Sequence, residues 1–118
     1  MYGKMKLLQN ENYVCMGGGN SSENWGLLDS SDPSDYFIHL SSFPSGYVIL
    51  RVLSPEELSS DGVPPGLMEA ALMCKNGTKY RHLRDIMVDW CICGNVRKGE
   101  VPGEAIFISK RQVKKLRV

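Results

Sequence analysis

With 42% hydrophobic and 23% charged residues, this chain of 118 residues has the composition of an ordinary globular protein and is long enough to build one core without disulfides or a structural metal. No apolar run approaches the roughly 18 residues of a membrane span, and the N-terminus lacks the apolar segment of a secretory signal. We therefore expect a single domain over residues 1–118, in the cytoplasm or nucleus and without a membrane partner.

The net charge of +1 hides an uneven distribution. Residues 1–74 hold three cations and nine acids, a net charge of −6, whereas residues 75–118 hold eleven cations and four acids, a net charge of +7. Either the two parts pair across one sheet and neutralise each other, or the basic part forms a face that attracts phosphate.

The first elements are a hairpin and a glycine-rich turn. Segments 4–9 and 13–16 contain apolar residues on either side of a polar turn, which predicts a hairpin. The run Gly17–Gly19 allows a backbone or a ligand to approach closely. Asn20 or one of the two serines after it is expected to cap a short helix near 21–28, with Glu23 near the positive end of that helix.

Two strands follow, over 35–40 and 47–53, joined by a turn at 41–46. Alternation in the first strand places Asp35, Phe37 and His39 on one face, which indicates a strand partly covered on both sides. The two strands are expected to form a hairpin. The polar, acidic segment 54–63 is the best candidate for a mobile insertion.

One helix is clear, over about 65–76. Its apolar residues fall at i, i+3, i+4 and i+7, and they are Leu67, Ala70, Ala71 and Cys74. Pro64 and Pro65 are expected in its first turn, and Gly77 in a left-handed conformation at its end.

Further strands are predicted over 86–93, 96–98, 105–108 and 113–118. The strands are grouped and do not alternate with helices, so we predict an α+β fold with a mostly antiparallel sheet of about six to eight short strands.

The four cysteines lack the paired spacing of a zinc site and are expected to be reduced and mostly buried; they are Cys15, Cys74, Cys91 and Cys93. We predict no metal and no cofactor, and the chain has no nucleotide-binding fingerprint.

The first candidate site is polar. The turn Gly17–Asn20 could cradle a phosphate or be purely structural. Asp35 and His39 lie about 13 Å apart along one strand, so they cannot form a dyad. His39 could instead meet Asn20, Asn24, Tyr47 or Asp89 across the sheet. Arg51 is expected to form a salt bridge, with Asp35 or Asp89 as its partner, in preference to a phosphate contact.

The second candidate site is basic. Its cations could bind the phosphates of a nucleic acid, or form an ordinary solvated surface with a basic tail. Tyr80 and His82 are interleaved with the first of them and could stack on unpaired bases. The predicted nucleic-acid-binding residues are Lys79, Arg81, Arg84, Arg97, Lys98, Lys110 and Arg111.

The order of motifs resembles the NFACT-R domain, found in fibronectin-binding-protein-like and NEMF-like ribosome quality-control factors and alone in short eukaryotic proteins. The resemblance runs from about Tyr13 to the C-terminus. It rests on Gly-x-Asn, an Asp-aromatic-x-His strand, Val-Ile-Leu-Arg, a Glu-Ala-Ala helix, Val-Asp-Trp, Val-Arg-Lys and Val-Pro-Gly-Glu. It implies a family polar cluster consisting of Gly18, Asn20, Asn24, Asp35, His39, Arg51 and Asp89.

The chain also departs from the family pattern. Gly19 stands where the family has an arginine, Glu23 where it has a glutamine, and Tyr47 where a second histidine is expected. Each change weakens phosphate binding at that place, so the basic residues of 75–117 are the better RNA surface. The segments that surround the domain in full-length factors are missing, so the resemblance assigns neither tRNA selection nor tail synthesis.

The resulting hypothesis is a non-enzymatic module that binds RNA or the ribosome in translation quality control. The alternatives are a protein-interaction adaptor, or a small enzyme that uses the turn Gly18–Asn20 with His39.

Overall fold

The computed structural model describes residues 6–41, 45–53 and 62–118. These residues form two α-helices, α1 (Ser21–Ser30) and α2 (Leu67–Asn76), and two 3-10 helices, Cys93–Asn95 and Lys110–Gln112. The strands are β1 (Lys6–Gln9), β2 (Tyr13–Gly17), β3 (Tyr36–Leu40), β4 (Val48–Val52), β5 (Met87–Ile92), β6 (Val96–Lys98), β7 (Ala105–Phe107) and β8 (Lys114–Arg117).

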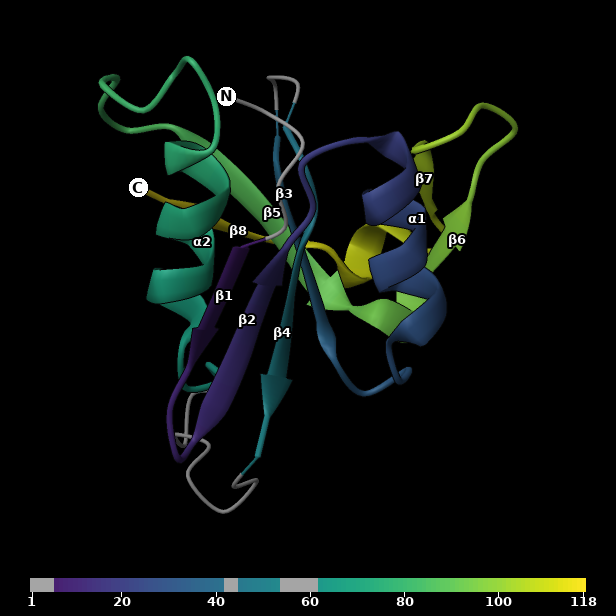
Figure 1. Cartoon of the computed structure of the whole chain (residues 1–118), viewed down its shortest axis with the longest axis horizontal. Helices are drawn as coiled ribbons and strands as arrows, with labels where there is room; N and C mark the ends of the chain where they lie inside the picture. The colour runs from purple at the N-terminus through teal and green to yellow at the C-terminus, as the bar shows by residue number, and fades with distance from the viewer. Residues whose placement is uncertain (1–5, 42–44, 54–61) are drawn as a thin grey trace.

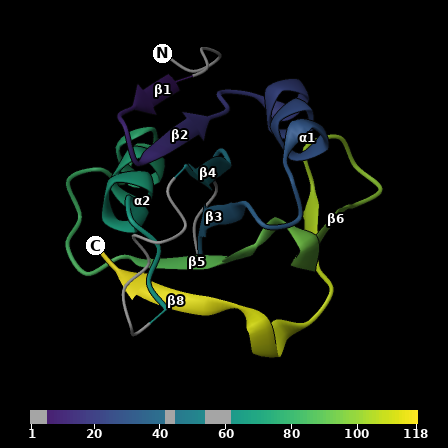
Figure 2. The same cartoon turned by 90° about the horizontal axis from the view of Figure 1, so that it is seen from below.

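Six strands form one sheet in the order β1-β2-β4-β3-β5-β8, and every neighbouring pair is antiparallel. Figure 2 shows this order, with α2 on one side of the sheet and α1 on the other. The α+β prediction and the two predicted hairpins, β1–β2 and β3–β4, are therefore confirmed. Residues 1–5, 42–44 and 54–61 lie outside the described part, and most of the predicted mobile insertion falls there.

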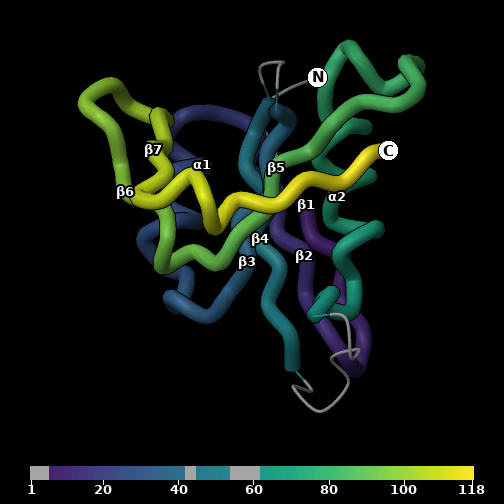
Figure 3. Tube along the Cα trace, turned by 180° about the vertical axis from the view of Figure 1, so that it is seen from behind, coloured from purple at the N-terminus to yellow at the C-terminus, as the bar shows by residue number. Residues whose placement is uncertain are grey.

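The last four strands divide between two sheets, where the sequence suggested one. β6 and β7 form a separate two-stranded ribbon, and β8 continues the main sheet beside β5 (Figure 3). The physical reason is the 3-10 helix after β5, which turns the chain out of the sheet. The side chain of Asn95 then holds the ribbon by donating to the Ser109 carbonyl and accepting from the Ser109 N–H, each at 2.8 Å.

The core has two layers, one on each face of the main sheet. The layer under α2 contains Ile38, Leu40 and Val88, and the layer under α1 and the β6–β7 ribbon contains Phe37 and Ile49. The alternation predicted for β3 is confirmed, because its odd and even residues enter different layers. Burial on both faces explains why this strand is almost entirely apolar.

The ends of α2 differ from the prediction. The helix begins at Leu67, not at a proline, because Gly66 occupies the N-cap with a left-handed φ of 86°. Only a glycine fits there, since a Cβ would come within 2.5 Å of the Tyr13 ring. At the other end Gly77 has a φ of −79°, so the predicted left-handed cap is wrong. Its N–H donates to the Met73 carbonyl at 3.2 Å, which closes the helix without that conformation.

No helix in the described ranges has both the length and the apolar character needed to cross a membrane.

Candidate nucleic-acid interface

A pocket of about 480 Å³ opens between the N-terminal end of α1 and the turn that follows α2. Figure 1 shows both helix ends at the same edge of the molecule, at the top of the view. Three segments far apart in the sequence line the pocket; they contribute Gly19, Asn20, Ser21, Asn24, Ser45, Gly46, Gly77, Thr78, Lys79 and Tyr80. The pocket thus joins the glycine turn to the first of the basic residues, which the sequence presented as separate sites.

Gly46 lines this pocket, and its backbone lies close to that of Gly18 behind it. A Cβ on Gly46 would overlap the carbonyl oxygen of Gly18, and a Cβ on Gly18 would overlap Oδ1 of Asn24. The Gly18 N–H donates to the Tyr47 carbonyl at 3.0 Å, and Asn24 Oδ1 accepts from the Tyr47 N–H at 3.1 Å. Gly18 and the buried Asn24 therefore fasten the turn to the start of β4, which is a structural role.

Asn20 is the N-cap of α1, as one of the predicted alternatives had it. Its side chain accepts from the Glu23 N–H at 2.9 Å, and the Glu23 carboxylate accepts from the Gly19 N–H at 2.7 Å. This is a variant of the capping box, in which Glu23 accepts from the residue before the N-cap and not from the N-cap itself. It satisfies one amide of the turn and places a negative charge where an anion would approach the helix. The N–H groups of Ser21 and Ser22 have no acceptor among the described residues.

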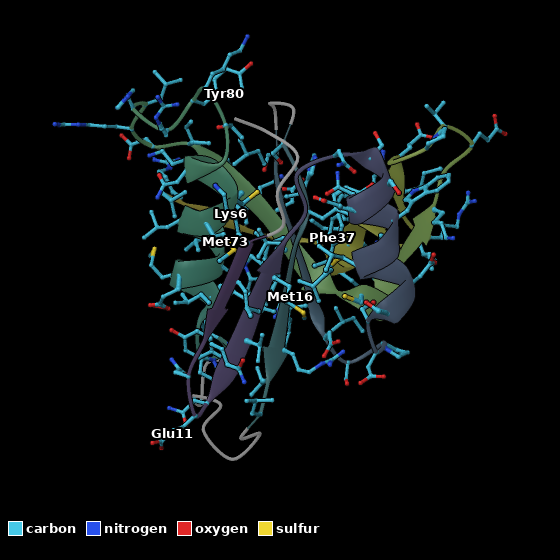
Figure 4. The ribbon with its side chains drawn as sticks, viewed as in Figure 1. Lys6, Glu11, Met16, Phe37, Met73 and Tyr80 are labelled. Carbon is cyan, nitrogen blue, oxygen red and sulfur yellow. The ribbon has the colours of Figure 1, made fainter. Side chains whose placement is uncertain are left out.

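The turn after α2 supplies positive charge beside the pocket. Residues 77–84 contain Lys79, Arg81 and Arg84 and no carboxylate, and all three cations are exposed. Lys79 Nζ lies 5.5 Å from the centroid of the Tyr80 ring, which packs partly against the core and lines the pocket. Figure 4 shows Tyr80 at the top of the view, above the C-terminal end of α2.

This turn is well ordered by its own hydrogen bonds. The hydroxyl of buried Thr78 donates to the Lys75 carbonyl at 2.7 Å and accepts from the Tyr80 N–H at 3.1 Å, while Arg81 Nη1 donates to the Thr78 carbonyl at 3.4 Å. The cations next to the pocket are therefore carried on a fixed backbone.

The remaining predicted cations lie elsewhere. Arg97 and Lys98 are on β6, and Lys110 and Arg111 are in the second 3-10 helix, away from the turn after α2 (Figures 1 and 3). Lys98 is also engaged, since its Nζ lies 2.8 Å from Asp29 and 5.2 Å from the centroid of the Trp25 ring. The structure thus divides the predicted basic set: Lys79 lines the pocket, and Arg81 and Arg84 follow it on the same turn.

His39 lines a second pocket, of about 370 Å³, on the other side of Ser45. It pairs with Asp89 across β3 and β5, and its ring lies 5.9 Å from that of Tyr47. Of the four predicted neighbours of His39, Tyr47 and Asp89 lie beside it, whereas Asn20 and Asn24 line the first pocket. Burial lowers the pKa of His39 and outweighs the opposing effects of backbone hydrogen bonding and of the Asp89 charge. The ring is therefore neutral at pH 7.

The predicted salt bridge of Arg51 is confirmed, with Asp35 as its partner at 2.9 Å. The Asp35 side chain is 5% exposed and also accepts from the Asp32 N–H at 2.9 Å. Hydrogen bonding to Asp35, with its charge, raises the pKa of Arg51. This pair lies at the opposite end of β3 from His39. The residues implied as one polar cluster therefore occupy three separate places.

All four cysteines are free and buried, as predicted. Burial raises the pKa of Cys15 and of Cys93 to about 12, and that of Cys74 to about 11, so these thiols stay protonated at neutral pH. In the part of the chain that the structure describes, no group of three or more His, Cys, Asp or Glu side chains could hold a metal ion.

Sequence reasoning missed much of the pocket wall, namely Ser45, Gly46, Gly77 and Thr78. In the sequence, the pairs Ser45–Gly46 and Gly77–Thr78 indicated only turns. Nothing in the local sequence indicates that the two turns meet.

The architecture defines the class: an α+β domain whose six-stranded antiparallel sheet is covered by one helix on each face. Among solved structures, the C-terminal part of the fibronectin/fibrinogen-binding protein from Streptococcus suis (FBPS) is similar, with a TM-score of 0.73 and 20% sequence identity. The match covers 100% of this chain and 45% of that chain, so this protein spans less than half of its neighbour. No family model and no curated protein matches. At this identity the likeness shows the fold. It agrees with the resemblance to a domain of fibronectin-binding-protein-like factors.

Proposed function

We propose that this protein is a non-enzymatic module that binds unpaired RNA along the edge where α1 and α2 meet. The observation that carries the proposal is the turn 77–84, with three exposed cations and no carboxylate, beside a pocket of about 480 Å³ that Tyr80 lines. Cations neutralise phosphates without regard to sequence, and an aromatic ring accepts the face of any base.

The charges around the pocket indicate how a strand would lie. Glu23 disfavours a phosphate directly on the N-terminus of α1, because its carboxylate already accepts from Gly19. The phosphates would instead follow Lys79, Arg81 and Arg84, with a base or ribose turned into the pocket. The resemblance to the NFACT-R domain supports the ribosome in the cytoplasm as the source of this RNA.

The first experiment measures the binding of a labelled single-stranded RNA by fluorescence anisotropy at 50 and 200 mM salt. Three phosphate contacts give a slope of about −2 in log affinity against log salt, or roughly a fifteenfold loss over that range. Affinity that does not change with salt, or no binding at either salt concentration, would refute the proposal.

Two matched triple variants then locate the surface. K79Q/R81Q/R84Q should lower the affinity at 50 mM salt by more than about tenfold and flatten the salt slope. R97Q/K110Q/R111Q removes the same charge from exposed positions away from the pocket and should change the affinity by less than about twofold. Equal losses in the two variants would mean that binding is a diffuse effect of net charge.

An enzymatic role receives less support. His39 lines one pocket and the glycine turn lines the other, and Asp35 is committed to Arg51. The described residues therefore offer no set of nucleophile, base and orienting group in one place.

A protein-binding adaptor is the second candidate. The edge strand β1 exposes Leu7 (66%) and Leu8 (42%), and an exposed strand edge is a template for pairing with another chain. The structural neighbour FBPS is, by its name, a protein that binds fibronectin and fibrinogen. This candidate would be favoured if the wild-type protein bound no RNA but bound immobilised fibronectin, and if L7E/L8E abolished the binding to fibronectin.

A further inference from the structure

The second pocket, around His39, has the size and chemistry of a site for one flat heterocycle. Its volume of about 370 Å³ lies within the range of small-molecule sites. Phe37, Tyr47 and Phe107 line it, and the Phe37 ring packs edge-on against Tyr47 at 4.9 Å and against Phe107 at 5.9 Å. Phe107 is half-buried, whereas Phe37 and Tyr47 are almost fully buried. The lining is thus aromatic and fixed, with Phe107 as the more accessible ring.

The polar atoms around this lining are mostly acceptors. Asp89 is 9% exposed, and its Oδ1 accepts from Ser41 at 2.7 Å and from Lys115 at 2.6 Å. Its Oδ2 has no donor among the described residues. The Glu104 carboxylate also lines the pocket, with Oε1 accepting from the Glu100 N–H at 3.0 Å. A neutral His39 ring has one acceptor nitrogen and one N–H donor.

The hydroxyl donors of the pocket are already used within the protein. The Ser41 hydroxyl donates to Asp89, the Tyr47 hydroxyl donates to the Gly103 carbonyl, and the Ser45 hydroxyl donates to the Gly46 carbonyl at 3.1 Å. The carboxylates of Asp89 and Glu104 therefore favour a ligand that brings donors of its own. A carbonyl group facing these carboxylates would leave both sides without a partner, which is unfavourable in a partly buried site.

Ser45 lines this pocket and also the one beside the basic turn, so the two lie on either side of the same residue. An RNA strand bound at the first pocket would pass the opening of the second. We infer that the pocket formed by Phe37, His39, Asp89, Glu104 and Phe107 takes one unpaired base and selects bases that carry an exocyclic amino group over uracil. This inference rests on the proposed RNA binding for its context, but the pocket's preference can be tested apart from it.

Cytosine and uracil are the decisive pair, because they differ in an amino against a carbonyl group and in the adjoining ring nitrogen. The wild-type protein should bind a cytidine 12-mer at least about fivefold tighter than a uridine 12-mer, because a carboxylate accepts from the cytosine amine and repels the uracil carbonyl. Equal affinities for the two oligomers would overturn the inference.

Variants assign the preference to this pocket. D89N keeps the shape of the side chain and adds an amide donor, so it should narrow or reverse the ratio of cytidine to uridine affinity. E104Q makes the same change of a carboxylate to an amide at an exposed position, and it replaces D89N as the test if D89N does not fold. E100Q, in the same β6–β7 connection but outside the pocket, should leave the ratio unchanged. A ratio that is unaffected by both D89N and E104Q would overturn the inference.

Titration with free cytidine and uridine, followed by NMR, separates this inference from the proposed function. Cytidine should shift the amide signals of residues 103–107 more strongly than uridine does, whether or not the protein binds RNA. If cytidine shifts these amide signals but the protein binds no RNA oligomer, the pocket remains a nucleoside site and the proposed function is refuted. Oligomer binding with no nucleoside shifts and no preference would refute the pocket alone.

Discussion

The backbones of Gly18 and Gly46 lie in close contact beside the pocket, and Gly46→Ala tests this contact directly. The new Cβ would lie closer than 3.0 Å to the Gly18 carbonyl oxygen, a distance that real Cβ atoms essentially never show. One of the two backbones must therefore move. Gly46 does not have a positive φ, so the cost comes from this contact and not from the backbone conformation.

The magnitude follows from what such a movement disturbs. Overpacking at a close contact costs about 1–3 kcal/mol. Separating the two segments also weakens the hydrogen bonds from Gly18 to Tyr47 and from Tyr47 to Asn24, each with a net contribution of about 1 kcal/mol. We expect Gly46→Ala to lower the free energy of unfolding by roughly 3–5 kcal/mol.

Gly26→Ala is the matched control. Gly26 lies within α1, and a Cβ there has nothing within 4 Å, so the same change should raise the free energy of unfolding by about 1 kcal/mol through helix propensity. Urea unfolding monitored by tryptophan fluorescence measures both variants. A loss below about 1 kcal/mol for Gly46→Ala would refute the argument that this backbone contact is rigid.

Two further predictions concern charged groups. The salt bridges of Arg51 and Lys98 have similar lengths, 2.9 and 2.8 Å, but the Asp35 carboxylate is 5% exposed and that of Asp29 is 55% exposed. Arg51→Met leaves a buried carboxylate without its cation, so it should lower the free energy of unfolding, measured in urea, by about 2 kcal/mol. Lys98→Met should lower it by less than about 1 kcal/mol. Equal losses in the two variants would contradict this reasoning. Burial lowers the pKa of His39 in the folded state, so at acidic pH the unfolded chain binds more protons than the folded protein. The free energy of unfolding should therefore fall as the pH drops below about 6.5, the pKa of a histidine in the unfolded chain, towards the lowered pKa of the folded state. Unfolding measured from pH 7.5 to 5 should show a weaker decline in His39→Gln, and an unchanged decline in that variant would exclude His39 as the cause.

The sequence by itself determined the elements and their buried faces. The spacing of Leu67, Ala70, Ala71 and Cys74 predicted the buried face of α2, and the alternation through β3 predicted that both sides of this strand are covered. The hairpin partners were likewise predicted, and the cap of α1 was narrowed to Asn20 or one of the two serines after it, because capping and strand pairing between neighbours depend on residues close in the chain. The salt bridge of Arg51 was expected, but its partner was left open between Asp35 and Asp89, and only the pairing of β3 with β4 decided for Asp35.

Tertiary structure alone decided what lies next to what. Burying apolar residues on both faces of one sheet brings the start of α1 and the end of α2 to the same edge, so the glycine turn meets Lys79 and Tyr80 there. The same packing carries Lys110 and Arg111 to another part of the surface, although they belong to the same basic third of the sequence. Charge and turn chemistry are properties of short segments, whereas a pocket depends on which segments the burial of distant side chains holds together.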